Sequence, residues 1–250
     1  MERVRISLVS YLNSKPFHYG IERYGLPHAE LILDHPADCA QKIITGEVDL
    51  GLVPVAVLPR MNYFEIVSDY CISANGPVRT VVLVSDVPLE NINTILLDYQ
   101  SRTSAMLIRI LAHFFWKKKV VWKASSCGFE TSQIGGRTAG LVIGDRAFQL
   151  ENRYRYIYDL SDEWKRFTGL PFVFAAWTAN RKLNPAFLHD FNACMAYGIE
   201  HLESVIKMQA DTFPHLNLDS YFRENLSFRF DEEKKRALNE FWVLQRKLTG

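Results

Sequence analysis

The sequence lacks the local signatures of the common cofactor and hydrolase sites. No GxGxxG, GxxxxGK[ST], HExxH or GxSxG pattern occurs in its 250 residues. Its four cysteines are widely spaced without a CxxC pair, and its seven histidines show no metal-ligand spacing. The sequence therefore predicts no metal site, no cofactor and no disulfide scaffold, and the cysteines are expected to be reduced core thiols.

Net charge and long apolar runs are also scarce. The 29 Lys and Arg residues nearly cancel the 28 Asp and Glu residues, which leaves a formal charge of +1. Such a chain has no overall field to attract nucleic acid or an anionic membrane, so any bound anion must be held locally. Runs such as VVLV and FVFAAW are far shorter than the roughly 20 residues of a membrane span. The charged start MERVRISLVS lacks the apolar segment of a secretory signal, so we expect a cytoplasmic protein.

The residues that are present alternate between strand and helix patterns. Hydrophobic residues make up 48% of the chain and charged residues 23%, as in ordinary folded proteins. The first 54 residues read as strand, helix, strand, helix, strand, over residues 4–9, 15–24, AELILDHP, 36–45 and VDLGLVP. Short connections in this order indicate parallel strands joined by right-handed crossovers, an α/β architecture.

The rest of the chain predicts a second α/β unit and a helical end. Residues 63–85 are rich in β-formers, and a strand to Leu97 precedes an amphipathic helix that reaches Phe115. Further strands are expected at 141–143 and within GLPFVFAAWTAN. The helical patterns after Asn184 are expected to cover the sheet of the first unit.

Four polar turns follow or flank predicted strands, namely SYLNSKP, NGPVRT, YQSRTSA and IGDRA. Ligands of open α/β sheets bind beyond the carboxyl ends of the strands, so these turns are the candidate site. In YQSRTSA the hydroxyls of Ser101, Thr103 and Ser104 lie at a helix start, which suits a carboxylate or phosphate. An ordinary N-cap by Ser101 or Thr103 accounts for the same residues equally well.

The other turns offer weaker signals. Asn13 can donate and accept hydrogen bonds but is not a strong base, and an Asx-type turn explains it as well. Thr80 follows what reads as a hairpin corner, from which its hydroxyl could face the same crevice. Asp145 is more typical of a cap on the next helix than of a catalytic acid.

Six segments in this order resemble the menaquinone-biosynthesis family that contains the chorismate dehydratase of the futalosine pathway. They are SYLNSKPF, GEVDLGLVPV, NGPVRTVVLVS, LDYQSRTSAMLIRILA, GLVIGDRA and DEWKRFTGLPFVFAAW, within roughly residues 4–180. The resemblance implies a two-lobed α/β fold of the type II periplasmic-binding-protein kind, with a double crossover hinge and a ligand cleft between the lobes. Residues 1–85 and 175–250 would form lobe one, and residues 86–174 lobe two.

The resemblance also implies a reaction and a site. The reaction is loss of water from chorismate to give 3-[(1-carboxyvinyl)oxy]benzoate, a carbon-oxygen lyase step that demands no cofactor. Asn13 would stabilise developing charge and Thr80 would contact the substrate from the hinge side. The base is unassigned, and the substrate's own enolpyruvyl carboxylate is one possibility. Contacts to this small dicarboxylate would come from Ser10, Tyr11, Ser101, Arg102, Thr103, Ser104 and Asp145.

Two alternatives stay open at this point. One is a non-catalytic cytoplasmic protein that binds a small carboxylate, because this fold is widely used for binding alone. The other is the sister 1,4-dihydroxy-6-naphthoate synthase, whose opening resembles SPCPNDTF rather than the YLNSKP found here. The sequence leaves an oligomer possible.

Overall fold

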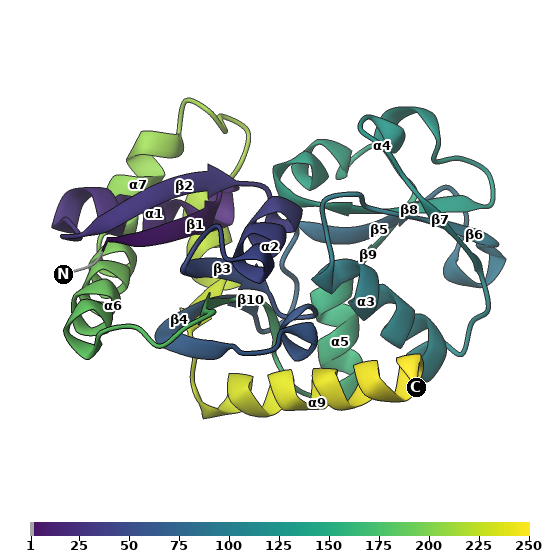
Figure 1. Ribbon diagram of the computed structural model, residues 1–250. Helices are drawn as coiled ribbons and strands as arrows, with labels where there is room; N and C mark the ends of the chain where they lie inside the picture. The colour runs from purple at the N-terminus through teal and green to yellow at the C-terminus, as the bar shows by residue number, and fades with distance from the viewer. Residues whose placement is uncertain (1–2) are drawn as a thin grey trace.

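The computed structural model describes residues 3–250 as two β-sheets with helices packed against them (Figure 1). A six-stranded sheet, in the order β11-β4-β10-β3-β1-β2, forms with its helices the unit that we call lobe one. A five-stranded sheet, in the order β7-β6-β8-β5-β9, forms with its helices lobe two. The α/β architecture with two units, predicted from the alternating patterns, is therefore confirmed.

The parallel part of lobe one follows the predicted order. Strand β1 (Val4–Val9) pairs in parallel with both β2 (Ala29–Asp34) and β3 (Leu50–Pro54). Helices α1 (Lys15–Tyr24) and α2 (Pro36–Thr45) connect these strands, each with a proline in its first turn, where the missing N–H costs nothing. The carboxyl ends of β1 and β3 thus lie at one edge of the sheet.

The antiparallel part of lobe one comes from distant segments. Strand β10 (Phe172–Ala179) lies between β3 and β4 (Glu65–Ala74), and β11 (Ser227–Arg229) pairs with the outer side of β4. Helix α6 (Pro185–Glu200) packs so closely on α1 that a Cβ at Gly20 would lie 2.0 Å from the Cys194 carbonyl oxygen. Only glycine fits at this helix crossing.

Lobe two contains a mixed sheet, and helix α3, the candidate anion-binding helix, packs on its central strand β8. Strands β6 and β8 run parallel, whereas β5 is antiparallel to both β8 and β9. Helix α3 begins at the predicted polar turn and continues into a π-helical turn, Leu111–Phe115. The elements are β5 (Val81–Ser85), β6 (Thr94–Leu97), α3 (Thr103–Ile110), β7 (Val121–Ala124), α4 (Phe129–Ser132), β8 (Thr138–Ile143), the 3-10 helix η5 (Gly144–Leu150), β9 (Tyr156–Asp159) and α5 (Leu160–Thr168).

Residues 75–80 and 169–171 are the two crossing segments that connect the sheet of lobe one with the elements of lobe two. Because β5 pairs with β8 and β9, residues 81–85 belong to lobe two, and the predicted boundary at residue 85 is wrong. The start of β10 likewise places residues 172–174 in lobe one, so the predicted boundary at residue 174 is also misplaced. An apolar strand pattern looks the same whichever sheet the strand joins, so the sequence could not place these edges.

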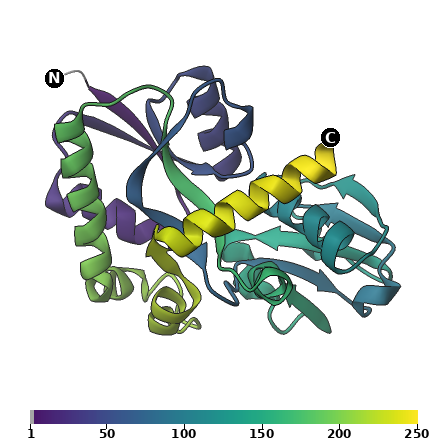
Figure 2. The ribbon, with the colours of Figure 1, turned by 90° about the horizontal axis from the view of Figure 1, so that it is seen from below.

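The C-terminal helix α9 (Glu232–Thr249) runs from lobe one across to lobe two (Figure 2). It packs on β10 and on α3, and Trp242 Nε1 donates to the Val55 carbonyl oxygen at 2.9 Å. The expectation that the final helices cover only lobe one holds for α6 but is wrong for α9. An amphipathic pattern shows that one helix face is buried, but it does not show which partner buries it.

Three helical elements of the described residues lie between α6 and α9. They are α7 (Leu202–Gln209), α8 (Leu218–Ser220) and the π-helical turn η6 (Tyr221–Asn225). The cysteine expectation needs one correction, because Cys127 is exposed while Cys39, Cys71 and Cys194 are buried. Within residues 3–250, no helix is both long and apolar enough to cross a membrane, and no cluster of His, Cys, Asp or Glu is arranged to hold a metal ion.

Candidate active site

A narrow cavity of about 60 Å³, the interlobe cavity, lies where the two lobes meet. Val9, Leu52 and Pro54 give its lobe-one wall an apolar character, and Ile143 contributes from lobe two. Small-molecule pockets usually hold roughly 300 Å³ or more, so a ring-bearing ligand requires the walls to move apart before it can enter. Among residues 3–250, the polar side chains that line the cavity are those of Tyr11, Asn13, Thr80, Ser101, Thr103 and Ser104.

The structure brings these six predicted residues together and leaves three others outside the cavity. The Ser10 amide bonds to the Asp34 carbonyl oxygen at 2.9 Å, and the Arg102 side chain is exposed beside an outer groove. Asp145 lies behind the wall and does not line it. Their predicted contacts with substrate are not supported, because closeness to a strand end does not decide which way a side chain points.

Asn13 lies in the single 3-10 turn η1 (Leu12–Ser14) that follows β1. Its carboxamide oxygen is buried and accepts no hydrogen bond from any described residue. The turn is held instead by the Ser14 hydroxyl, which contacts the carbonyl oxygens of Val9 and Tyr11. An Asx-type turn therefore does not explain Asn13, and a buried acceptor without a protein partner beside a cavity suits a ligand that donates.

The start of α3 satisfies one of its own first-turn amides and also lines the cavity. The Ser101 hydroxyl accepts the Ser104 amide at 3.0 Å, and the Thr103 hydroxyl accepts the Ala56 amide of lobe one at 3.3 Å. Both oxygens act as acceptors in these bonds, so their hydrogens can point to other groups. The N-cap position is Arg102, which makes no side-chain cap bond, so the predicted N-cap by Ser101 or Thr103 is wrong, although the Ser101 hydroxyl still satisfies an amide of the first turn. The anion-binding role of this helix start stays a prediction.

Thr80 lies in the first crossing segment and is only 2% exposed. Its carbonyl oxygen accepts the Gly144 amide at 2.9 Å, and its hydroxyl lies 3.5 Å from that of Tyr221. The preceding residue, Arg79, has a φ of +65°, and the Asp159 carboxylate accepts its amide at 2.6 Å. Asp159 therefore holds the turn that carries Thr80.

Tyr11 spans the boundary between the lobes. Its hydroxyl donates to Gln100 Oε1 at 2.5 Å, and its ring lies over Gly144, where a Cβ would come within 2.8 Å of the ring. Gly144 has a φ of +69°, so a larger residue would be strained there as well as blocked. Tyr11 is the one titratable side chain among the described residues that line the cavity, and burial, helped by Asp98, raises its pKa above the ordinary value.

Comparison with known proteins identifies the family. The profile of a family described as menaquinone biosynthesis matches residues 4–247. The chain belongs to this family. A curated relative, the chorismate dehydratase of Thermus thermophilus, is 24% identical over 264 aligned positions, which cover 94% of this chain and 93% of the relative.

Solved structures with the same fold include a periplasmic binding protein. A protein of Archaeoglobus fulgidus superposes with a TM-score of 0.77 at 13% identity and covers 98% of this chain and 97% of its own. The periplasmic aliphatic sulphonate binding protein of Escherichia coli gives a TM-score of 0.60 at 15% identity, with 100% and 94% covered. These likenesses confirm the two-lobed, periplasmic-binding-protein-like fold that the menaquinone-biosynthesis resemblance implied.

Sequence reasoning missed the ion pair behind the lobe-two wall. The Asp98 side chain is fully buried, and Arg146 donates to it at 2.7 Å and to Glu130 at 3.1 Å. Arg146 also donates to Gln100 Oε1 at 3.1 Å, the same oxygen that Tyr11 bonds. Burial raises the pKa of Asp98 and the Arg146 guanidinium opposes the rise. Charged residues directly after the buried strands, in LLD and IGDR, were the available signal.

Asp145 differs from its predicted role as a helix cap. Both of its carboxylate oxygens lie 3.1 Å from the Leu12 amide nitrogen, across the lobe boundary. No side chain caps η5. The Asp145 carboxylate in lobe two therefore accepts a hydrogen bond from the lobe-one turn that carries Asn13.

Proposed function

We propose that this protein is a chorismate dehydratase, which eliminates water from chorismate to give 3-[(1-carboxyvinyl)oxy]benzoate. Membership of the menaquinone-biosynthesis family and the 24% identical chorismate dehydratase of Thermus thermophilus support the choice. The observation that carries the proposal is that the buried, unpaired Asn13 oxygen and the hydroxyl-rich start of α3 line one cavity from opposite lobes. That pairing matches a ligand with a hydroxyl donor and an anionic group.

The chemistry asks little of the protein beyond positioning. The proton on carbon 3 of chorismate is acidic because its loss gives an anion delocalised through the neighbouring double bond to the ring carboxylate. Expulsion of the 4-hydroxyl then forms the aromatic ring, and the proton and hydroxide leave together as water. The gain in aromaticity supplies the driving force, so the enzyme mainly orients the substrate and stabilises developing charge.

The cavity provides neutral partners for a doubly charged ligand. No Lys, Arg or His is found among the described lining residues, so a carboxylate must be held by hydroxyls and by the positive end of α3. We assign that role to Ser101, Thr103 and Ser104, which line the cavity. We assign Asn13 to the substrate hydroxyl and the enolate, and Thr80 to a contact from the crossing segment.

The same lining residues suggest where the proton goes. Tyr11 is their only titratable side chain, and its raised pKa makes it a poor base near neutrality. Asp145 is bonded to the Leu12 amide behind the wall, so it is not placed to remove the proton. We therefore assign the proton to the enolpyruvyl carboxylate of the substrate itself, in a conformer that the cavity fixes.

Incubation of the purified protein with chorismate tests the proposal. We expect 3-[(1-carboxyvinyl)oxy]benzoate to accumulate, detected by its mass and by the absorbance of the new benzene ring. The same incubation without protein measures spontaneous decay of chorismate. Saturable binding of chorismate without product would favour a non-catalytic binding protein, and neither binding nor product would remove chorismate as the ligand.

A further inference from the structure

We propose that Asp145 is a positioning residue, whose carboxylate draws the η1 turn across the lobe boundary and so sets Asn13 against the substrate. The inference rests on the proposed chorismate dehydratase function, because it concerns the residue assigned to the reacting hydroxyl. Asp145 does not line the interlobe cavity, so it acts through the backbone rather than on the substrate.

The bond from Asp145 reaches the residue immediately before Asn13. Its two oxygens share the Leu12 N–H group, and each lies 3.1 Å from the amide nitrogen, although the two residues are 133 positions apart in the chain. Asp145 stands at the start of η5 in lobe two, whereas η1 follows the first strand of lobe one. The bond therefore exists only while the two walls of the cavity are together.

A second bond between the lobes acts on the same turn. Tyr11 donates to Gln100 Oε1, and Arg146 fixes that oxygen from behind with a bond of 3.1 Å. The two residues that precede Asn13 are thus both tied to lobe two, one by its side chain and one by its amide. Within lobe one, Ser14 ties the other end of the turn to the Val9 carbonyl oxygen. Asn13 stands between these anchors while its own oxygen accepts no bond from the described residues.

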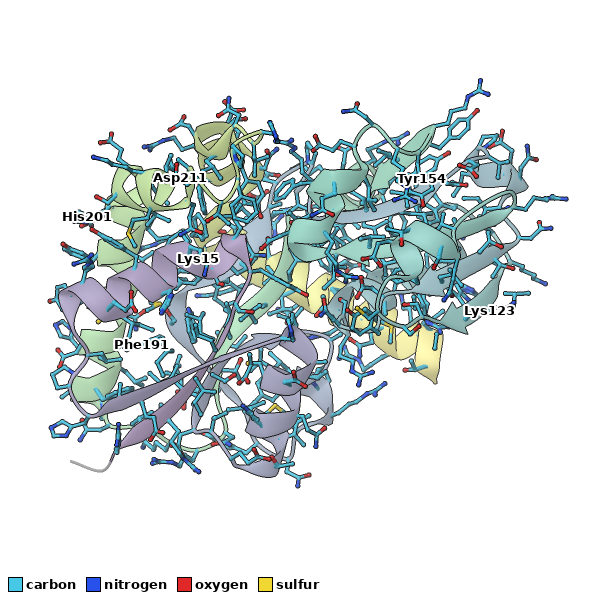
Figure 3. All side chains as sticks on the ribbon, turned by 90° about the horizontal axis from the view of Figure 1, so that it is seen from above. Lys15, Lys123, Tyr154, Phe191, His201 and Asp211 are labelled. Atoms are coloured by element: carbon cyan, nitrogen blue, oxygen red, sulfur yellow. The ribbon has the colours of Figure 1, made fainter. Side chains whose placement is uncertain are left out.

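The charge of Asp145 makes the positioning sensitive to pH. Burial raises the pKa of Asp145 to about 6, opposed by the bond from Leu12 and by Lys15. Lys15 lies at the start of α1 in lobe one, where Figure 3 labels it, and its positive charge favours the ionised form of Asp145. The other titratable groups that sense its charge are Tyr11 on the η1 turn and Tyr221 on η6. Protonation would replace a charge-assisted bond with a weaker neutral one.

Three variants separate positioning from catalysis by the carboxyl group. We expect Asp145→Ala to lower kcat for chorismate by about tenfold to a hundredfold with little change in KM, because the turn loses its anchor. We expect Asp145→Asn, which keeps a neutral acceptor, to lose only about fivefold at pH 7.5. In wild-type protein kcat should fall as the pH drops through about 6, towards the level of Asp145→Asn, whose kcat should not change over that range. The matched control is Asp49→Asn. It neutralises a lobe-one carboxylate that does not line the cavity and that accepts the Arg5 amide at 2.8 Å. This variant should keep the wild-type dependence of kcat on pH.

Hydrogen exchange at the η1 turn supplies a readout that needs no turnover. Amides of residues 11–14 should exchange faster in Asp145→Ala than in wild type, and at the wild-type rate in Asp49→Asn. The proposal would be overturned if Asp145→Ala kept the wild-type kcat, or if kcat of Asp145→Asn still fell as the pH drops through about 6. It would also be overturned if the amides of residues 11–14 exchanged at the wild-type rate in Asp145→Ala. If wild-type protein leaves chorismate untouched, the proposed function fails, and the exchange experiment still decides whether Asp145 holds the turn.

Discussion

The two walls of the interlobe cavity rest on different kinds of interior. Behind the lobe-one wall, Phe17, Trp177 and Phe191 pack edge to face, with ring centroids 5.7 and 4.9 Å apart. Behind the lobe-two wall, Asp98 and Arg146 form a buried ion pair. The lobe-one wall is therefore fixed mainly by apolar packing, whereas the lobe-two wall depends on groups whose charge must be retained.

This difference suggests a division of labour in the proposed reaction. Lobe one carries Asn13 on a short turn but does not by itself fix that turn, because the Leu12 amide and the Tyr11 hydroxyl bond to lobe two. Lobe two carries the hydroxyl-rich start of α3 and the Asp145 carboxylate, which accepts the Leu12 amide of the η1 turn. Closure of the lobes thus completes the candidate site, as expected for a fold in which ligands bind between two domains.

The strongest test of the lobe-one wall is Asn13→Ala. We expect turnover of chorismate to fall by about a hundredfold to a thousandfold, the loss typical when one oriented polar group is removed from a site that stabilises developing charge. The free energy of unfolding should hardly change, because the Asn13 oxygen makes no hydrogen bond within the described residues. Steady-state kinetics and urea unfolding measure the two quantities.

A control and a contrary outcome sharpen this test. Asn62→Ala alters an exposed asparagine that borders another groove and should leave both quantities unchanged. Asn13→Ala with wild-type turnover would refute the role of Asn13. A large loss of stability in the same variant would instead show that the side chain supports the fold.

The corresponding test of the lobe-two wall is Arg146→Met, which should act first on stability. Removing the guanidinium leaves the fully buried Asp98 and the nearby Glu130 without their cation, so we expect a loss of about 3 kcal/mol in the free energy of unfolding. Arg223→Met removes an exposed cation paired with Asp219 and should cost far less stability, because exposed ion pairs are screened by water and salt. Equal losses in urea unfolding of the two variants would contradict the contrast between the lobes.

The sequence was most informative where the pattern is local. The strand and helix order of residues 4–54 needs only periodicity and capping residues, and the helix start at Thr103 needs only the hydroxyls that precede it. The menaquinone-biosynthesis resemblance selected Asn13 and Thr80 from many polar residues, and both line the cavity. Their catalytic roles are still predictions.

The features that were missed depend on partners far apart in the chain. Arg146 pairs with Asp98 from 48 residues away, and Asp145 bonds Leu12 from 133 residues away. The apolar pattern of residues 81–85 predicts a strand but does not indicate which sheet the strand joins, so the predicted lobe boundary at residue 85 was wrong. Such choices depend on packing between elements, which local periodicity does not encode.

The smallest expected effect compares one carboxylate from each lobe. Asp159 is half-buried and accepts the Arg79 amide, and burial raises its pKa to about 6 against the opposing backbone bonds. Burial also acts on Asp49 of lobe one, but the Arg5 amide and the guanidinium groups of Arg181 and Arg5 outweigh it and hold the pKa below the usual value. The two groups therefore have pKa shifts of opposite sign.

Opposite signs predict different pH dependences of stability. A carboxyl whose pKa is higher in the folded state adds stability at low pH and loses that contribution as the pH rises through about 6. Asp159→Asn should therefore destabilise the protein more at pH 5 than at pH 7.5, by a difference on the order of 1 kcal/mol. Asp49 has a lowered pKa, so it stays ionised throughout this range and the cost of Asp49→Asn should be the same at both values. Urea unfolding of both variants at the two pH values measures the difference. If Asp159→Asn lowered the free energy of unfolding equally at both pH values, Asp159 would not make the stability of lobe two depend on pH.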